Sequence, residues 1–167
     1  MEKKHVYSTN IKWIGNKGVG TKDYLSYERS HVISVKGKNE IEASSDPAFR
    51  GDNSKYNPEE LLVASLSSCH MLWYLHLCAV EGIIVTGYTD NAIGTMIETP
   101  LGSGYFSEVI LYPIVTITDK SMEEKAIELH DKAHQFCFIA NSVNFPVKHK
   151  AICCIRNHRK IGKQMEK

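Results

Sequence analysis

The segment NPEELLVASLSSCHMLWYLHLCAVEG, residues 57–82, predicts a long central helix. Asn57 can cap a helix, Pro58 suits its first position, and the two glutamates that follow favour the positive end of the helix dipole. Good helix formers continue as far as Gly82, which is a typical helix end. We therefore expect a helix over about residues 58–81. Because it is apolar on more than one face, we expect it to be buried on most sides.

Segments rich in β-forming residues lie on both sides of this helix. Alternating apolar and polar residues, separated by glycine-containing turns, predict an antiparallel meander over about residues 5–45. β-Branched and aromatic residues interrupted by Gly and Pro predict a second β region over about residues 83–118. The segment VKHKAICCI, about residues 147–155, predicts one closing strand.

A second helix is expected over about residues 121–136, where the sequence is amphipathic. Ser121 is a suitable N-cap, and Glu124 three residues later completes a capping box. The order of elements, with strands and helices not strictly alternating, indicates an α+β fold. We expect a single domain over residues 1–167, with antiparallel sheets packed around two buried helices.

Composition narrows the classes of function. The chain has 167 residues with 20 Lys and Arg against 19 Asp and Glu, so nothing favours nucleic acid or an acidic membrane as a partner. The N-terminal residues MEKKHVYSTN have no apolar signal-peptide core, and no run of about 18 apolar residues predicts a membrane span. Five cysteines in such a chain indicate free thiols in a reducing compartment, so we expect a cytoplasmic protein.

Two segments carry a resemblance to a known family: RGDNSKYNPEELLVASLSSCH, residues 50–70, and AHQFCFIANSV, residues 133–143. The marks are an Asn-Pro-Glu-Glu-Leu-Leu helix start, a Cys ten residues after its first Glu, and a second Cys between Ala-His and Asn. These features closely resemble the OsmC/Ohr family of osmotically inducible and organic-hydroperoxide-resistance proteins. The resemblance covers about residues 13–153 and implies an OsmC-like fold and an intertwined homodimer.

The resemblance also implies a function, since members of this family are thiol peroxidases that reduce organic hydroperoxides. By resemblance Cys69 attacks the peroxide and Cys137 resolves the oxidised cysteine. Glu59 and Arg50 support the first cysteine, with Arg29 as the alternative to Arg50. The resemblance implies no bound cofactor, a hydroperoxide substrate, and an external dithiol reductant for which a lipoyl group on a partner protein is a candidate.

Elementary thiol chemistry agrees with these roles. The thiolate is the nucleophile, and burial in an apolar helix would raise the thiol pKa, so a reactive Cys69 needs a nearby cation. Arg50 can supply that charge, and Glu59 can hold its guanidinium through a bidentate pair. On one continuous helix Glu59 and Cys69 lie about 15 Å apart along the axis. Either the arginine bridges them across a bend, or Glu59 and the arginine come from the other chain.

Several residues leave alternatives open. Phe138 follows the second cysteine where many members of the family have proline, so an external thiol could resolve Cys69 instead. His70 faces about 100° away from Cys69 on a helix, whereas His76 returns to nearly the same face. A Cys–His hydrolase is therefore conceivable, as is a non-catalytic binder of an apolar ligand. No standard metal-ligand spacing is present, and we expect no metal site.

The remaining cysteines are expected to be structural, and even Cys69 has a plainer interpretation as a small apolar residue that fills space. Cys78, Cys153 and Cys154 are predicted to be buried thiols. On the closing strand, alternation predicts that Cys154 points inward and Cys153 outward. Glu59 could equally be only a partner of the helix dipole.

Overall fold

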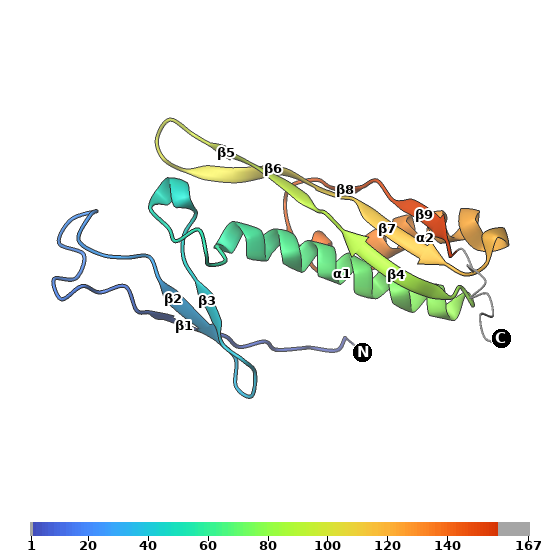
Figure 1. Cartoon of the computed structure of the whole chain (residues 1–167), viewed down its shortest axis with the longest axis horizontal. Coiled ribbons are helices and arrows are strands. Elements are labelled where there is room, and N and C mark those ends of the chain that lie inside the picture. Colours follow the sequence, from blue (N-terminus) through green and yellow to red (C-terminus); the bar gives the residue numbers. More distant parts are fainter. Residues whose placement is uncertain (1, 157–167) are drawn as a thin grey trace, which may run out of the picture. The chain divides into compact units, whose positions relative to one another are not determined.

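The computed structural model describes residues 2–156 and separates into two compact units, the first ending at Leu62 and the second beginning at Val63 (Figure 1). The first unit contains one sheet, and the second contains most of the central helix, two further sheets and the second helix. The expectation of one domain over residues 1–167 remains a prediction.

The first unit is built on an antiparallel meander, as predicted. Its strands are β1 (Asn10–Trp13), β2 (His31–Ser34) and β3 (Ile41–Ala43), hydrogen-bonded in the order β1-β2-β3. A loop with a short 3₁₀ turn, η1 (Pro47–Phe49), then leads toward the central helix. The sheet places the two loops that bear Arg29 and Arg50 on the same unit.

The central helix α1 covers Pro58–Val80, which confirms the predicted range. Asn57 caps it as expected: its side-chain oxygen accepts from the Glu60 amide at 2.7 Å, and the Glu60 carboxylate accepts from the Asn57 amide at 3.1 Å. This reciprocal arrangement is a capping box, which satisfies two amides that the first helical turn leaves unpaired.

The end of α1 is also the one predicted. Gly82 has a φ of 74°, in the left-handed region that glycine adopts without a steric penalty. The amide of Ile83 donates to the Cys78 carbonyl at 2.8 Å, and the Gly82 amide donates to the Ala79 carbonyl at 3.3 Å. These two bonds form a Schellman motif, so the chain leaves the helix with its last carbonyl groups paired.

Two three-stranded sheets complete the second unit. One has the order β4 (Val85–Asp90), β7 (Pro113–Ile117), β9 (Ile152–Ile155). The other has the order β5-β6-β8, with bounds Ile93–Glu98, Gly104–Leu111 and Val147–His149. The β4–β7 and β5–β6 pairs are antiparallel, but β8 and β9 pair parallel to β6 and β7. The fold class is α+β as predicted, and the expected antiparallel sheets are extended by two parallel pairs, β6–β8 and β7–β9.

The single closing strand expected over residues 147–155 is wrong, because the chain forms two strands there. Between β6 and β7 the amide of Tyr112 donates to the Asp90 carboxylate at 2.7 Å, and Pro113 has no amide hydrogen to donate. The ladder therefore breaks at Tyr112 and the strand passes from one sheet to the other. The closing segment follows the same path and breaks at Lys150–Ala151.

The second helix begins later than predicted. A 3₁₀ turn, η2 (Lys120–Met122), precedes α2 (Glu123–Phe136). The carboxylate of Asp119 accepts from both the amide and the hydroxyl of Ser121 at 2.8 Å. The prediction that Ser121 caps the helix is therefore wrong, because Asp119 competes for that position with a stronger acceptor.

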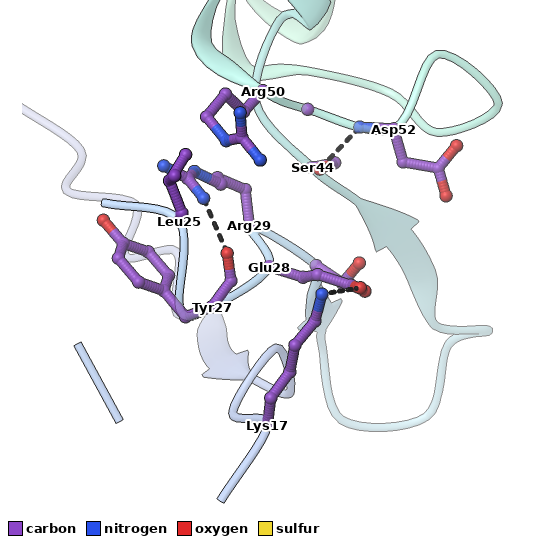
Figure 2. Close-up of a pocket in the computed structure, with 10 residues that line it drawn as sticks. Lys17, Leu25, Tyr27, Glu28, Arg29, Ser44, Arg50 and Asp52 are labelled. Carbon is purple, nitrogen blue, oxygen red and sulfur yellow. Dashed lines mark hydrogen bonds and ion pairs between the residues drawn. The ribbon is translucent and has the colours of Figure 1, made fainter. Parts of the chain in front are cut away.

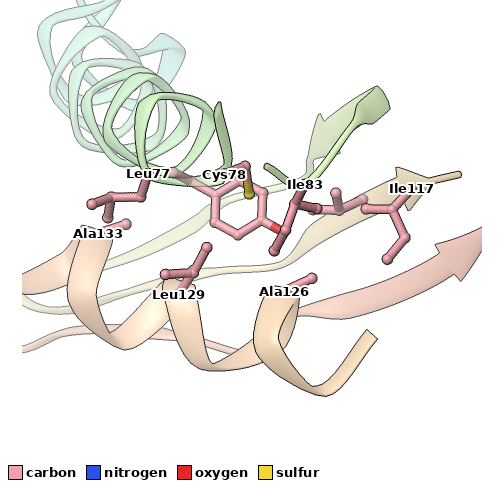
Figure 3. Close-up of a cluster of buried hydrophobic side chains, with 9 residues drawn as sticks. Leu77, Cys78, Ile83, Ile117, Ala126, Leu129 and Ala133 are labelled. Atoms are coloured by element: carbon pink, nitrogen blue, oxygen red, sulfur yellow. The ribbon is translucent and has the colours of Figure 1, made fainter. Parts of the chain in front are cut away.

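A cluster of apolar side chains joins α1, α2 and the sheet β4-β7-β9 (Figure 3). In Figure 3 Leu77 and Cys78 face Leu129 and Ala133 across the space between the helices. Burying a large apolar side chain stabilises a fold by about 1.5–3 kcal/mol, so this cluster is a main source of stability. Its members are Tyr74, Leu77, Cys78, Ile83, Val115, Ile117, Ala126, Leu129 and Ala133.

Only one stripe of α1 is buried within the chain, contrary to the expectation of burial on most sides. The fully buried positions recur at helical spacing and are Leu66, His70, Tyr74, Leu77 and Cys78. By length and composition alone, α1 is long and apolar enough to cross a membrane. One such helix is weak evidence of a membrane protein, since core helices of soluble proteins pass the same test.

Two buried histidines connect the helices in this core. His70 Nε2 lies 2.9 Å from His130 Nδ1, and the rings stack with an interplanar angle of 7°. The Tyr74 ring stacks on the His130 ring at a centroid distance of 3.9 Å. The His149 ring lies 5.5 Å from the His70 ring and 5.8 Å from the His130 ring, measured between centroids. Burial is the first cause that lowers the pKa of His70 to about 4 and that of His130 to about 3, and the neighbouring histidines add to it.

These depressed pKa values predict an acid-sensitive fold. In the unfolded chain the histidines take up protons near pH 6.5, whereas the folded chain keeps them neutral to about pH 4, so stability is lost as the pH falls between these values. From pH 7 to pH 5 we expect the free energy of unfolding to fall by about 2 kcal/mol for each histidine. Urea unfolding at the two pH values measures this loss.

The control compares two substitutions. His130→Gln should lower stability at pH 7 but reduce its dependence on pH, while His76→Gln at an exposed position should change neither. An unchanged pH dependence in His130→Gln would contradict the assignment.

Candidate active site

The structure brings Cys69 and Cys137 together within the second unit. Cys69 lies on α1 and is partly exposed, whereas Cys137 is the C-cap of α2 and is buried. Burial raises the pKa of the Cys137 thiol to about 11, and a side-chain hydrogen bond with Cys69 raises it further. Two thiols from separate helices thus interact, and the raised pKa keeps the Cys137 thiol protonated at neutral pH.

The turn after Cys137 wraps around its sulfur. The amide of Ala140 donates to Cys137 Sγ at 3.4 Å, and the amide of Asn141 donates to the Cys137 carbonyl at 3.0 Å. The Asn141 side chain donates to the Gln135 carbonyl at 2.9 Å, which closes the turn. The turn forms with Phe138 in place of proline, so this substitution does not prevent contact between the two thiols.

Aromatic side chains surround the cysteine pair. Trp73, four residues after Cys69 and hence on the same face of α1, stacks on Phe136 at a centroid distance of 5.1 Å. It also contacts Phe138 edge-on at 5.5 Å. These two phenylalanines flank Cys137 and are 45% and 68% exposed. The cluster of Trp73, Phe136 and Phe138, here called the aromatic cluster, presents an open apolar surface beside the thiols.

Within residues 2–156 no histidine is placed to activate Cys69. His70 points into the core toward His130, and His76 is exposed and packs edge-on against Trp73 at 5.8 Å. Over residues 2–156 no hydrogen bond joins Cys69 to an imidazole. The same residues contain no group of three or more His, Cys, Asp or Glu arranged to hold a metal ion.

The other cysteines differ in part from expectation. Cys78 is buried as predicted, and burial raises the pKa of its thiol. On β9 the prediction is reversed: Cys153 packs against the core, and Cys154 is exposed. The parallel pairing of β9 with β7 sets which face of the strand meets α2, and the sequence did not predict this pairing.

The two candidate arginines line a cavity of about 320 Å³ in the first unit (Figure 2). Arg50 is the C-cap of η1, with a left-handed φ of 65°. Arg29 comes from the loop before β2, where its Nη1 and Nη2 donate to the carbonyls of Tyr27 and Tyr24 at 2.6 and 2.8 Å. Its guanidinium also lies over both tyrosine rings at 4.2–4.3 Å. Both arginines are therefore near each other but belong to a different unit from Cys69.

Glu59 is not paired with either arginine. It lies in the first turn of α1, and its Oε2 is buried with no hydrogen-bond partner among the described residues. The ion pairs found in residues 2–156 include none between Glu59 and Arg50 or Arg29. The expected bidentate pair does not form within one chain, and the role of Glu59 stays a prediction.

Some features of the site were missed at the sequence level. The position of Trp73 one turn after Cys69 follows from helical spacing, but spacing alone does not show that its ring meets Phe136 and Phe138. The contact of His70 with His130 and His149 joins three segments that are distant in sequence. No pattern of neighbouring residues predicts it. Arg50 and Arg29, which the resemblance offers as alternatives, line one cavity together.

The arrangement defines a class of protein: an α+β fold with a long central helix whose cysteine meets a second cysteine at the end of another helix. The family model described as OsmC-like protein matches residues 51–151. An OsmC-like protein of unknown function from Vibrio cholerae is 33% identical, with 89% of this chain and all of that chain covered and a TM-score of 0.81. The chain belongs to the OsmC-like family.

More distant structures share the fold. An organic hydroperoxide resistance protein from Elizabethkingia anophelis is 21% identical with a TM-score of 0.65, covering 92% of this chain and all of that one. A further organic hydroperoxide resistance protein, from Legionella pneumophila, is 20% identical with a TM-score of 0.61, over 90% of this chain and 99% of that one. A comparison with curated proteins gives no match.

The raised pKa of Cys137 predicts a particular pattern of alkylation. With iodoacetamide at pH 8, Cys137 should react slowly because its thiol stays protonated, and its rate should rise steeply toward pH 11. Cys69→Ala removes one of the causes of the raised pKa, so the alkylation profile of Cys137 should move to lower pH. Peptide mass spectrometry over a pH series measures both profiles.

The exposed Cys154 supplies the matched control, because Cys154→Ala removes a thiol that does not contact Cys137. Its Cys137 profile should equal that of the parent. Equal profiles in Cys69→Ala and the parent would show that the two thiols do not interact in solution.

Proposed function

We propose that this protein is a thiol peroxidase that reduces organic hydroperoxides, with Cys69 as the attacking and Cys137 as the resolving cysteine. The observation that carries the proposal is the interaction between the two thiols, through which Cys69 contributes to the raised pKa of Cys137. Membership of the OsmC-like family, whose fold organic hydroperoxide resistance proteins share, supports it.

The environments of the two thiols support this assignment of roles. A nucleophilic cysteine must lose its proton and be reachable by substrate, and Cys69 is the more exposed of the pair. Cys137 is buried with a raised pKa, so it remains a thiol and can donate to the Cys69 sulfur. A protonated, buried thiol is poorly suited to attack peroxide but is well placed to react with an oxidised neighbour.

The reaction follows in two steps. The Cys69 thiolate attacks one peroxide oxygen, the O–O bond breaks, and the alkoxide leaves and takes up a proton as the alcohol, so Cys69 becomes a sulfenic acid. Cys137 then loses its proton and attacks the Cys69 sulfur, which releases water and leaves a disulfide. An external dithiol, for which a protein-bound lipoyl group is a candidate, would reduce the disulfide in a reducing compartment such as the cytoplasm.

The aromatic cluster supports an organic substrate. Trp73 and Phe138 offer apolar surface beside Cys69, against which an alkyl or aryl group can be buried. Hydrogen peroxide has no group to bury there. The same surface favours one alternative function, the binding of an apolar ligand without turnover, which would leave both thiols unchanged.

We also propose that the working form is a homodimer. Three large apolar side chains on α1 or just after it are 62–68% exposed: Leu72, Val80 and Ile84. The helix is therefore more apolar than its burial within one chain explains. Large exposed apolar surfaces mark interfaces, and a second copy would remove this one from water. The unpartnered Glu59 carboxylate oxygen and the arginines without carboxylates fit an active site completed by the second chain.

The peroxidase proposal predicts a defined change of mass. One equivalent of cumene hydroperoxide should remove two hydrogens from the reduced protein and two free thiols, as the disulfide forms. In Cys137→Ser the same treatment should instead add one oxygen to Cys69, because no resolving thiol is available. Intact-mass spectrometry with thiol titration measures each change.

Cys154→Ser serves as the control and should behave as the parent does, since its side chain is exposed on β9. If the parent, Cys69→Ser and Cys137→Ser all keep their masses and thiols, the protein is not a peroxidase, and apolar ligand binding becomes the better proposal.

A shared site predicts complementation between inactive variants. Cys69→Ser and Arg50→Ala should each lack peroxidase activity as homodimers. Mixed dimers, formed by unfolding and refolding the two together, should regain about a quarter of the parent activity if half the dimers are mixed and each has one intact site. Analytical ultracentrifugation establishes the dimer first. Mixed dimers without activity would rule out a site that takes its arginine from the second chain.

A further inference from the structure

We propose that Trp73 and Phe138 position the resolving cysteine, because their contact attaches the turn after Cys137 to the helix that carries Cys69. In this role both side chains act through Cys137, as positioning residues. The inference rests on the proposed peroxidase function for its consequence in the reaction, and its test separates the two.

The packing of α2 against the core ends one turn before Cys137. Ala133 is the last residue of α2 in the apolar cluster that joins the two helices. Cys137 is buried as well but lies outside that cluster. A contact beyond Ala133 is therefore needed to hold the end of α2 against α1.

The hydrogen bonds of the turn shape it but do not attach it to α1. The Ser142 hydroxyl donates to the Phe138 carbonyl at 2.7 Å. The bonds of Ala140 and Asn141 described above likewise join groups within residues 135–142. These bonds keep the turn compact, whereas its place beside α1 depends on side-chain contacts.

The backbone of Cys137 is not fixed by the residue that follows it. Cys137 leaves the helix in an extended conformation, with φ −67° and ψ 108°. A following proline would favour an extended backbone on steric grounds, but residue 138 is phenylalanine. This chain thus relies on the side chain of Phe138 rather than on a restricted backbone.

Trp73 supplies the contacts from α1. Its ring stacks on Phe136 at a centroid distance of 5.1 Å and meets Phe138 edge-on at 5.5 Å. Trp73 packs against the core cluster, so it is an anchored side chain, and it lies one turn after Cys69. The residues before and after Cys137 therefore contact one ring on the face of α1 that carries Cys69.

The exposure of Phe138 supports this role. Its side chain is 68% exposed, so burial in the core does not explain an aromatic residue at this position. An aromatic pair shifts an equilibrium by about two- to tenfold. A contact of that size raises the effective concentration of the Cys137 thiol at Cys69 without locking the two together.

Positioning matters because the oxidised Cys69 has two fates. When Cys137 attacks the sulfenic acid, an S–S bond forms, the S–O bond breaks, and the hydroxide leaves as water after it takes up a proton. When a second peroxide arrives first, the Cys69 sulfur attacks it, the O–O bond breaks, and a sulfinic acid forms that cannot become the disulfide. Holding Cys137 close favours the first fate.

The main test does not depend on peroxide. The full chain is equilibrated with reduced and oxidised glutathione, so that exchange forms the Cys69–Cys137 disulfide and converts one oxidised glutathione into two reduced molecules. Mass spectrometry of the linked peptides gives the effective concentration of the two thiols. All proteins carry Cys154→Ser, so that this exposed thiol forms no mixed disulfide with glutathione.

Phe138→Ala should lower this effective concentration about two- to tenfold, because the edge-on contact is lost. Phe138→Tyr keeps the ring and should match the parent. Trp73→Ala loses both ring contacts and should lower the value further than Phe138→Ala. Tyr105→Ala is the matched control, since it removes a 59% exposed aromatic ring from β6 and should change nothing.

Hydrogen peroxide then tests the consequence for the reaction, because it has no organic group to contact the aromatic cluster. The peroxide concentration at which half of Cys69 becomes sulfinic acid should fall in Phe138→Ala by the same factor as the effective concentration. Intact-mass spectrometry counts the oxygens added.

Equal effective concentrations in Phe138→Ala and the parent would overturn the proposal, and so would an equal loss in Tyr105→Ala. A parent that forms no disulfide with glutathione would overturn both this inference and the peroxidase function. If Phe138→Ala forms the disulfide less readily than the parent but neither protein reacts with peroxide, the positioning role stands and the peroxidase function fails.

Discussion

Packing of α1 against α2 is the constraint on which the rest of the second unit depends. Tyr74 and Leu77 from α1 enter one cluster with Leu129 and Ala133 from α2, and the ring of Tyr74 stacks on that of His130. This contact sets the rotation of each helix about its axis. Once the two helices are in register, residues at fixed helical spacings from the cluster are positioned as well, and Cys69 meets the end of α2 where Cys137 lies.

The same packing separates the two thiols chemically. Cys137 lies where α2 ends against the core, so it is buried and its pKa is raised, while Cys69 faces away from the buried stripe and is partly exposed. Two identical side chains thus acquire different properties from their surroundings alone. That difference gives a physical basis for the order of steps in the proposed reaction, in which Cys69 attacks the peroxide first and Cys137 then attacks the oxidised Cys69.

Polar groups without partners are the most informative features outside the thiol pair. A buried oxygen of Glu59 has no hydrogen-bond partner within the described residues. Buried donors and acceptors are costly when unmatched, so such groups indicate ligands or partners that a single chain does not contain. The exposed apolar residues on α1 carry the same implication for a second copy.

The sequence alone determined the features that depend on local interactions. The limits of α1, its Asn57 cap, its Gly82 end and the antiparallel meander follow from backbone preferences within a few residues, and the family resemblance identified Cys69 and Cys137. Only the tertiary structure decided the break of the closing segment into β8 and β9, the inward face of Cys153 and the histidine contacts. These depend on pairing between segments distant in sequence, where no local preference distinguishes one arrangement from another.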